Sequence, residues 1–480
     1  MVTVAEMRAA DAAATVPEET LIRRAGTLVA VAALRMLGGA YGMRVVVVAG
    51  KGNNGADGRV AAEILRRRGA RVTVVGPEAV IGECDLVVDA ALGTGLRGPY
   101  DAPLVPAGAR VLAVDIPSGV DGDTGEAPGR PMAATRTETF AALKPGLLQG
   151  DGPRYAGAVE VADIGLGELA TRIALVEDGD VARLVPRRPT LTHKWATAVC
   201  VVAGSPGMEG AAVLSTEGAA RAGAGMVRLG VPGTAVATAP EVGAWPTEAV
   251  RFELGPTRWA RDVLDVLGRC RALVIGPGLG RTSDTVEEVR AVLFGARVPV
   301  VVDADALFAL GDVHSARPAV AGDRPVVVTP HDGEYERLLG EPAGPDRVAA
   351  ARRLADALGV VALVKGSLTA VAAPTGEVLL SASGSPRLAT AGTGDVLSGV
   401  IGAFLARGTG PLEAAALAAH VHGRAAADGP AEGLVAGDLP HLISERLSAW
   451  LGRPAAALAP EGGGERPTAM QPGAAEGGRG

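Results

Sequence analysis

Short runs of valine and other apolar residues alternate along the chain with segments whose apolar residues recur at helical spacing. The runs of the first half are RVVVVAG, RVTVVG, DLVVDA, RVLAVDIP and AVEVADIG, and between the first two lies the helical pattern DGRVAAEILRRRG. Continuous apolar runs separated by helices are typical of a parallel sheet buried on both faces. The pattern predicts a Rossmann-like three-layer α/β domain, whose ligands bind in loops at the carboxyl ends of the strands.

A second α/β series follows, with the apolar runs ATAVCVVAGS, GMVRLGVP, ALVIGPGLG, PVVVDADAL, PVVVTPHDGE and VVALVKGS and a closing helical stretch, PLEAAALAAHVHGRAAAD. No period is shared by the two halves. We therefore expect a first domain at residues 1–175, a linker or entry segment at 176–190 and a second α/β domain at 191–452. The remaining segment, 453–480, consists of Gly, Ala, Pro and Glu without apolar periodicity, which predicts a disordered tail.

The composition excludes several classes of protein. Hydrophobic residues make up 48% of the chain and charged residues 21%, which suits packed cores. A net charge of −7 with 3% aromatic residues argues against nucleic-acid binding, which needs basic surface and stacking rings. No stretch is apolar enough to span a bilayer, and the start lacks the pattern of a signal peptide. We expect a cytoplasmic protein that forms a homo-oligomer, with its three separated cysteines reduced and buried.

Asparagine and lysine are nearly absent from the chain. Its only two asparagines, Asn53 and Asn54, stand side by side in AGKGNNGADG, and its four lysines are Lys51, Lys144, Lys194 and Lys365. Where arginine is so abundant, each remaining lysine is a candidate for a position at which the planar guanidinium fails, although chance retention is the alternative. The asparagines are either turn formers with left-handed backbone or neutral oxygen ligands that also donate hydrogen bonds.

Polar side chains follow three strand ends of the first half. The stretch VVVVAGKGNNGADGRVAAEIL predicts a strand, a glycine turn and a helix start, which favours an anion such as a pyrophosphate. Asp89 ends the strand in VVDAALGTGLRG, and Asp115 and Ser118 follow the strand in VLAVDIPSGVDGDTG. Amide, carboxylate and hydroxyl oxygens on one rim suit a weakly charged hard cation as well as ribose hydroxyls.

The segments GKGNNGADG, VVDAALGTGLRG, VDIPSGVDGDTG and ALKPG together resemble the NAD(P)H-hydrate epimerase family, over essentially all of residues 1–167. The resemblance implies a potassium ion held by Asn54, Asp89 and Ser118, with Asp115 catalytic at the reacting ring. It also implies contacts with the hydrated nucleotide at Asn53, Asn54, Gly55, Ala56, Asp57, Gly93, Thr94, Gly95, Leu96, Arg97, Gly98 and Asp115. The family usually has a second glycine where this chain has Ala56, and a methyl group there would crowd the loop if φ were positive.

In the second half, LATAGTGDVLSG predicts a Gly-Thr-Gly-Asp turn that opens a helix. Its backbone amides would face a phosphoryl group, with Asp395 beside them as a base. The alternative is that Asp395 is only the N-cap of the helix. Lys365 and Ser367, in ALVKGSLTA, lie at a strand end suited to nucleotide phosphate. His331, in TPHDGE, is either structural or a substrate contact, and we favour the substrate because the same rim carries Asp395.

The segments HK, AGSPGMEGAA, RAGAGMV, IGPGLG, VDADAL, TPHDGE, KGS, GTGDVLSG and HG resemble, in the same order, the ADP- or ATP-dependent NAD(P)H-hydrate dehydratase family, a branch of the ribokinase-like fold. The similarity covers about residues 190–450. It implies hydrate contacts at Ala211, Gly280, His331 and Asp395. It also implies nucleotide contacts at Lys365, Gly366, Ser367, Leu368, Thr369 and Gly394, with magnesium accompanying ADP. The glycine-containing segment usual after HK is missing in HKWATAV, so a different packing at the start of this domain is expected.

Together the two resemblances imply an enzyme that repairs hydrated NADH and NADPH. The first domain would convert the R hydrate to the S hydrate, and the second would dehydrate the S hydrate, forming AMP and phosphate from ADP. Hydroxide is a poor leaving group, and phosphorylating the ring hydroxyl makes elimination easy, so a kinase fold can perform a dehydration. The choice between ADP and ATP stays open. The alternative is a ribokinase-like small-molecule kinase with a non-catalytic nucleotide-binding module at its N-terminus.

Overall fold

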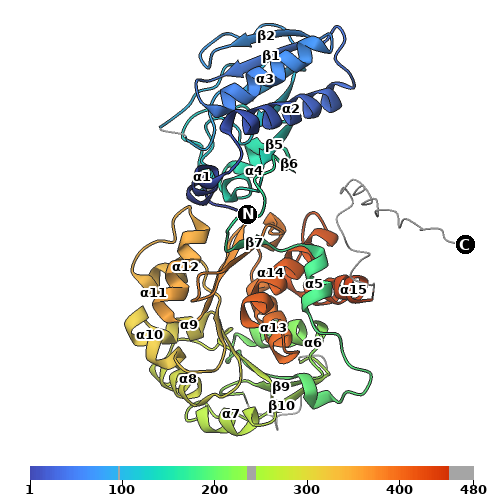
Figure 1. The fold of residues 1–480 in the computed structure, drawn as a ribbon. Coiled ribbons are helices and arrows are strands. Elements are labelled where there is room, and N and C mark those ends of the chain that lie inside the picture. The colour runs from blue at the N-terminus through green and yellow to red at the C-terminus, as the bar shows by residue number, and fades with distance from the viewer. Residues whose placement is uncertain (96–97, 235–244, 453–480) are drawn as a thin grey trace, which may run out of the picture.

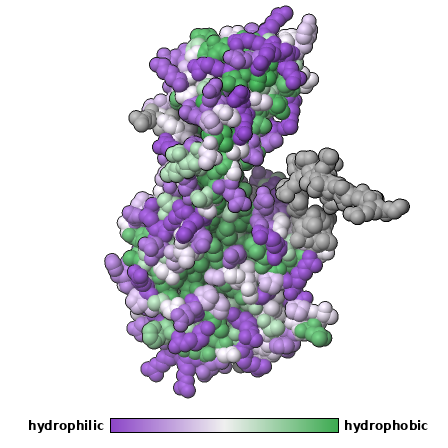
Figure 2. Space-filling view, in the orientation of Figure 1, coloured by the Kyte–Doolittle hydropathy of each residue, from purple (hydrophilic) through white to green (hydrophobic). Residues whose placement is uncertain are grey.

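The computed structural model describes residues 1–95, 98–234 and 245–452, which form two α/β units placed end to end (Figure 1). The space-filling view shows a narrow waist between them (Figure 2). Within the described ranges no helix is long and apolar enough to cross a membrane. The three cysteines, Cys84, Cys200 and Cys270, are free and buried, as the composition predicts.

The first unit is built on a six-stranded parallel sheet with the strand order β2-β1-β3-β4-β5-β6. Its strands are β1 (Arg44–Ala49), β2 (Arg71–Val75), β3 (Leu86–Ala90), β4 (Arg110–Val114), β5 (Arg136–Phe140) and β6 (Ala158–Ala162). In the central strands Val47 of β1 pairs with Val74 on one side and Val88 on the other. These strands correspond to the apolar runs RVVVVAG, RVTVVG and DLVVDA, which the hydrophobic pattern predicted as buried strands.

Helices cover one face of this sheet. They are α2 (Glu18–Leu37) and α3 (Asn53–Arg67), which pack against each other and the sheet over a core of alanine, valine and leucine. The opposite face is covered by connecting segments, with Ile81, Ala102 and Met132 over the other side of β1, β3 and β4. The short elements α1 (Val4–Ala13), η1 (Pro145–Leu147) and α4 (Gly152–Ala156) lie at the end of the unit that faces the second one (Figure 1).

The second unit has a ten-stranded sheet with the order β10-β9-β8-β11-β12-β13-β14-β15-β16-β7. All pairs are parallel except β14–β15 and β15–β16. Its strands are β7 (Ile173–Leu175), β8 (Ala198–Val202), β9 (Met226–Gly230), β10 (Ala249–Phe252), β11 (Ala272–Ile275), β12 (Val300–Val302), β13 (Val326–Val328), β14 (Val361–Val364), β15 (Thr369–Ala372) and β16 (Val378–Ser381).

Helices cover both faces of the second sheet, so that its central strands are completely buried. One face carries α5 (Asp178–Leu184), α6 (Glu209–Arg221), α13 (Thr393–Ala406), α14 (Pro411–Asp428) and α15 (Leu439–Leu451). The other carries α7 (Ala260–Leu267), α8 (Ser283–Gly295), α9 (Asp305–Leu310), α10 (Val313–Val320), α11 (Asp332–Leu339) and α12 (Arg347–Leu358). The 3₁₀ turns are η2 (Lys194–Thr197), η3 (Pro386–Leu388) and η4 (Ala436–Asp438).

The boundary between the units differs from the one the sequence predicts. Residues 173–175, expected at the end of the first domain, form β7 and pair in parallel with β16 of the second sheet. Part of the expected linker is the helix α5, whose Val181 is fully buried against the second unit. Two features explain the difference. A three-residue edge strand is too short to show a periodicity of its own, and its partner β16 lies about 200 residues further along the chain. The expected tail, residues 453–480, lies outside the described residues.

Candidate active sites

The glycine turn after β1 brings the two asparagines to the first turn of α3. A Cβ at Gly55 would lie 2.0 Å from the carbonyl oxygen of Gly50, so only glycine fits the close approach of helix and turn. Ala56 lies inside α3 and is absent from the described residues with positive φ. Its methyl group therefore causes no backbone strain at the position where the related family usually has glycine.

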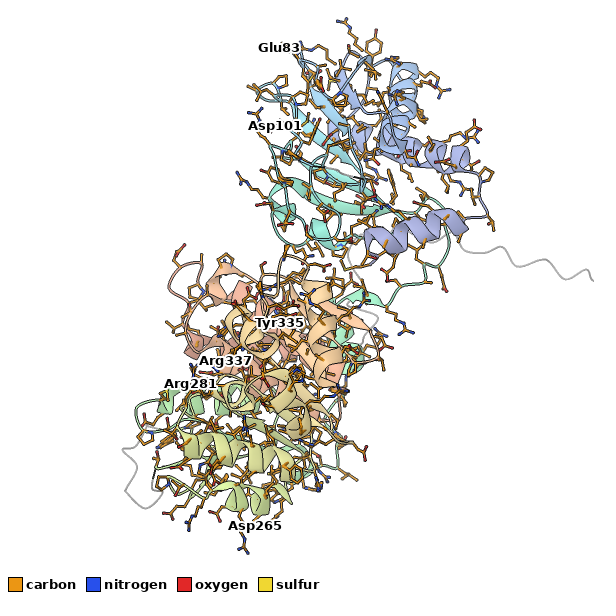
Figure 3. The ribbon with its side chains drawn as sticks, turned by 90° about the vertical axis from the view of Figure 1, so that its left-hand side faces the viewer. Glu83, Asp101, Asp265, Arg281, Tyr335 and Arg337 are labelled. Atoms are coloured by element: carbon orange, nitrogen blue, oxygen red, sulfur yellow. The ribbon has the colours of Figure 1, made fainter. Side chains whose placement is uncertain are left out.

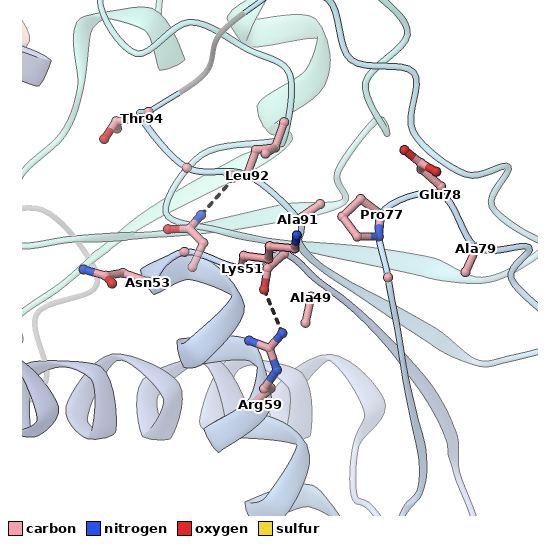
Figure 4. A pocket seen from close by; sticks show the side chains of 16 residues that line it. Ala49, Lys51, Asn53, Arg59, Pro77, Glu78, Ala79, Ala91, Leu92 and Thr94 are labelled. Carbon is pink, nitrogen blue, oxygen red and sulfur yellow. Dashed lines mark hydrogen bonds between the residues drawn. The ribbon is translucent and has the colours of Figure 1, made fainter.

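Both asparagine side chains are tied to other segments. Asn53 Nδ2 donates to Glu18 Oε1 of α2 over 2.8 Å. Asn54 Nδ2 donates to the carbonyl oxygens of Leu92 (3.0 Å) and Val114 (2.7 Å), which follow β3 and end β4. Asn54 thus joins three strand-end loops, and the bond to Leu92 is drawn in Figure 4. An aspartate there would have no amide hydrogens for these carbonyls.

Two adjacent cavities open on either side of the asparagine pair. The first, of about 870 Å³, lies over the turn after β1 and is shown in Figure 4, where Arg59 donates to the carbonyl oxygen of Gly50 over 2.8 Å. The second, of about 620 Å³, lies between the strand ends and the helices α1 and α2. The described residues that line both are Asn53, Asn54 and Thr94. This arrangement suits an extended ligand that passes across the asparagines.

Of the predicted hydrate contacts, three from the loop after β3 line the first cavity: Gly93, Thr94 and Gly95. Asp57 and Asp115 line the second. Gly98 has a positive φ of 80° and lines neither cavity. Leu96 and Arg97 lie outside the described residues.

Asp115 is held by a buried lysine. Lys144, which is 1% exposed, forms an ion pair with Asp115 Oδ1 and also donates to Thr139 Oγ1 and the Phe140 carbonyl oxygen, both over 2.9 Å. Thr139 Oγ1 and the Phe140 amide each donate to the same carboxylate oxygen over 3.1 Å. Asp115 itself has a φ of 65°, rare outside glycine and common at functional sites. No described residue bonds to Oδ2, which leaves that oxygen available to a ligand.

The third predicted set, Asn54, Asp89 and Ser118, lies around the loop that follows β3. Asp89 is fully buried, and its Oδ2 accepts from the Ser118 amide over 2.9 Å. Burial raises the pKa of this carboxyl, and the bonds from Ser118 offset the effect only in part. In the described part of the chain no basic side chain pairs with Asp89. A buried carboxylate without a cation, next to hydroxyl and amide oxygens, fits a bound monovalent ion.

In the second unit, Asp395 lies in the first turn of α13, next to a glycine with left-handed backbone. Gly392 precedes the helix with a φ of 91° and serves as its N-cap, so Asp395 is not the capping residue. The helix is positioned by α6, because Gly218 and Gly399 let the two backbones approach closely. Burial, and then the negative charge of Asp303, raise the pKa of Asp395 to about 7. The carboxyl is therefore poised to take a proton near neutral pH.

Lys365 lies next to the same turn. Its Nζ is 2.7 Å from Asp303 Oδ1, and a Cβ at Gly394 would lie 3.4 Å from this nitrogen. Ser398 Oγ donates to the other oxygen of Asp303 over 2.6 Å, so the carboxylate bridges a strand end and α13. Burial disfavours the charge of Lys365, but Asp303, Glu334 and Asp395 outweigh it and raise its pKa. The ammonium group stays charged where an anionic ligand would meet the turn.

The predicted nucleotide contacts converge on a cavity of about 410 Å³. Its lining includes Lys365, Gly366, Ser367, Thr369 and Gly394. The exception is Leu368, which is 1% exposed and packs with its side chain in the core, so that only its backbone is available to a ligand. His422 also lines this cavity, and burial lowers its pKa to about 4.

Of the four predicted hydrate contacts of this unit, Gly280 and Asp395 lie near the two aspartates of VDADAL, Asp303 and Asp305. Gly280 donates its amide to Asp305 Oδ2 over 2.9 Å, and Asp305 adds to the negative charge around Asp395. Ala211 packs against Gly278, because a Cβ added to Gly278 would lie 2.8 Å from the Cβ of Ala211. His331 caps α11, because its Nδ1 accepts from the amide of Gly333 over 3.0 Å. Its other nitrogen, Nε2, lies 3.5 Å from Glu334 Oε1 of the same helix.

Two arginines border this rim. Arg281 follows Gly280 and pairs with Asp305 Oδ1 over 2.7 Å. Its guanidinium lies 4.9 Å from the ring centre of Phe308, and that of Arg337 lies 3.9 Å from the same ring. Figure 3 shows both arginines close together on the flank of the unit, with Tyr335 nearby. Each guanidinium is attracted electrostatically to the face of this ring.

Sequence reasoning missed the residues that act through a charged partner. Lys144, Asp303 and Ser398 carry no predicted role, although they lie in the motifs ALKPG, VDADAL and GTGDVLSG. The scarcity of lysine was the available signal, since of the described lysines Lys144 and Lys365 are the ones in these ion pairs, Lys144 buried and Lys365 half-buried.

Comparison with known proteins matches both units. Residues 199–449 match the family model described as NAD(P)H-hydrate dehydratase, and residues 18–81 and 76–146 match that of the YjeF-related protein N-terminus. The chain is 41% identical over 453 residues to the bifunctional NAD(P)H-hydrate repair enzyme Nnr of Mycobacterium tuberculosis, covering 85% of this chain and 90% of the relative. It is 36% identical over 510 residues to the protein of that name from Moorella thermoacetica, covering 92% and 95%.

Among solved structures, a ribokinase-like superfamily protein from Enterococcus faecalis is similar to the second unit. Its TM-score is 0.51 with 25% sequence identity, and the match covers 60% of this chain and 98% of that one. The ribokinase-like fold expected for the second unit is thereby confirmed.

Proposed function

This chain belongs to the family of bifunctional NAD(P)H-hydrate repair enzymes, and we propose that the cavities at its two sets of strand ends are the two active sites. The first unit epimerises hydrated NADH and NADPH, and the second dehydrates the hydrate with consumption of a nucleotide. The rival interpretation, a kinase with a non-catalytic N-terminal module, does not account for relatives that match over both units under one bifunctional name.

The position of Asp395 carries the assignment of the dehydratase site. The hydrate's hydroxyl would lie against Asp395, with the terminal phosphoryl group of ADP or ATP over the amides of the turn and Lys365 beside it. Asp395 takes the hydroxyl proton as the oxygen attacks phosphorus, and Lys365 offsets the negative charge that develops. The electron pair of the ring nitrogen then expels phosphate, the neighbouring ring carbon loses a proton to water, and the ring returns to the reduced nicotinamide. Magnesium bound with the nucleotide would supply further charge neutralisation on the phosphates.

In the first unit we place the hydrated ring in the 620 Å³ cavity, against the free Oδ2 of Asp115. The rest of the nucleotide would extend past Asn53 and Asn54 into the 870 Å³ cavity, where the start of α3 favours its pyrophosphate. We assign Asn54, Asp89 and Ser118 to a potassium ion, which would neutralise the buried carboxylate and stiffen the loop after β3. A cytoplasmic location and a homo-oligomeric state remain predictions.

The assignment is tested with purified protein and a mixture of both hydrate epimers. With ADP or ATP and magnesium, the absorbance of reduced nicotinamide should return completely, in a fast phase for the S hydrate and a second phase for the R hydrate. Without nucleotide no absorbance should return. If only the S fraction recovers at any protein concentration, the epimerase assignment is wrong, and if neither recovers, both are wrong.

A further inference from the structure

Asp57 is a buried carboxyl group without a partner. It lies in α3, one turn beyond the asparagine pair, and is 5% exposed. No described residue forms a hydrogen bond or ion pair with its side chain. Asp115, in the same cavity, is by contrast held by three donors on one oxygen. A buried polar group left unsatisfied destabilises a fold, so its presence in a ligand cavity calls for a functional reason.

The charged groups around Asp57 keep it neutral. It faces Asp115 after β4, Lys144 before η1, Asp11 from α1 and Glu18 from α2. Lys144 is already paired with Asp115. Burial, and then the negative charge of Asp115, raise the pKa of Asp57 to about 8. The carboxyl group therefore carries a proton at neutral pH, while its neighbour Asp115 is the carboxylate of an ion pair.

A structural role explains Asp57 less well. Asp57 is the fifth residue of α3 and lies beyond the first turn, where an acidic residue stabilises a helix as an anion through the partial positive charge of the helix N-terminus. A neutral carboxyl contributes little to that effect and caps no amide in this helix. Two carboxyl groups in one cavity, one protonated and one ionised, are instead the usual arrangement of a catalytic acid and its base.

We propose that Asp57 is the general acid of epimerisation and that Asp115 is its partner base, an inference that rests on the epimerase function assigned above. The hydroxyl of the hydrate is on the ring carbon bonded to the ring nitrogen, so this carbon can invert by opening and closing the ring. Such a route needs one base at the hydroxyl and one acid at the nitrogen. It needs no second water molecule on the opposite face of the ring.

The protons balance as follows. Asp115 takes the hydroxyl proton, the carbon–oxygen bond becomes a carbonyl, and the carbon–nitrogen bond breaks with its electron pair moving to nitrogen. Asp57 gives its proton to that nitrogen. Rotation about the neighbouring carbon–carbon single bond then presents the other face of the carbonyl. Nitrogen attacks this face, its proton returns to Asp57, and Asp115 returns its proton to the oxygen. Nothing is oxidised, reduced or consumed.

The test compares Asp57→Asn with the parent protein and with Glu63→Gln, which makes the same carboxyl-to-amide change at an exposed position of α3. Epimerisation is followed from pH 6 to 9.5 by chromatography of the two hydrates, with the uncatalysed rate subtracted. In the parent and in Glu63→Gln the rate should fall as pH rises through about 8, because Asp57 loses its proton. In Asp57→Asn the epimerisation rate should drop by about 10²–10⁴-fold, and the residual rate should not fall as pH rises through about 8.

Dehydration of the pure S hydrate is the internal control, since it takes place in the other unit and should be unchanged. Asp57→Glu, which keeps a proton donor, should recover part of the rate together with the fall at alkaline pH, a pattern that lost folding cannot produce. The inference is overturned if Asp57→Asn keeps the parent's rate within about threefold or keeps its alkaline fall. It is also overturned if Asp57→Glu and Asp57→Asn are equally inactive. A parent protein that does not epimerise at all refutes the epimerase assignment instead.

Discussion

The pH dependence of dehydration follows directly from the surroundings of Asp395. A base with a pKa of about 7 is about half ionised at pH 7 and about a tenth ionised at pH 6. The rate with S hydrate and ADP should therefore fall about tenfold per pH unit below neutrality. Asp395→Asn should keep hydrate and nucleotide binding but lose about 10²–10⁴-fold in rate, because the amides of the turn remain and the base does not.

The charges of Asp303 and Lys365 should shift this acid limb, the fall of the dehydration rate below neutral pH, in opposite directions. The negative charge of Asp303 raises the pKa of Asp395, so Asp303→Asn should shift the limb to lower pH. The positive charge of Lys365 lowers it, so Lys365→Met should shift the limb to higher pH, whatever its effect on the plateau. Stopped reactions at saturating substrate, read as reduced-nicotinamide absorbance, give each profile. Shifts in one common direction, or an Asp395→Asn enzyme at near the parent rate, would refute the assigned base.

Three further predictions concern the first unit and the boundary. Lys144→Met should lower the free energy of unfolding by about 3–5 kcal/mol, measured by urea denaturation, because it leaves the carboxylate of Asp115 buried and unpaired; an unchanged midpoint contradicts the ion pair. Protein stripped of potassium should epimerise slowly and recover when the ion is added back, whereas Asn54→Ala should be slow in both conditions. A chain that begins at residue 168 should dehydrate the S hydrate, while one that begins at 176 should aggregate, since it lacks β7 and exposes the edge of β16; equal solubility would contradict this.

The sequence predicted the two sheets because their central strands are buried on both faces and therefore read as continuous valine runs. The strand β7 escaped prediction, since it is an edge strand of three residues whose partner lies far along the chain. Its neighbour β16, with the sequence VLLS, is likewise too short for its pattern to identify it as a strand.

The candidate sites were predictable to the extent that backbone geometry demands particular residues. Glycines at turns and polar residues at strand ends mark the loops around Asn54, Asp115 and Asp395. The partners Lys144 and Asp303 could not be assigned from the sequence, because their effect depends on which buried charge they meet. The neutral state of Asp57 depends in the same way on tertiary burial next to Asp115.

Complementation between two single-site variants tests the central claim, that one chain holds two separate sites acting in sequence. The substrate is the pure R hydrate with nucleotide and magnesium, given to Asp115→Asn, to Asp395→Asn and to an equal mixture of both. Each variant alone should return almost no reduced-nicotinamide absorbance, because one cannot epimerise and the other cannot dehydrate. The mixture should restore the absorbance at a rate near that of the parent protein. Recovery of the R hydrate by either variant alone, or a mixture as inactive as its components, would contradict the account.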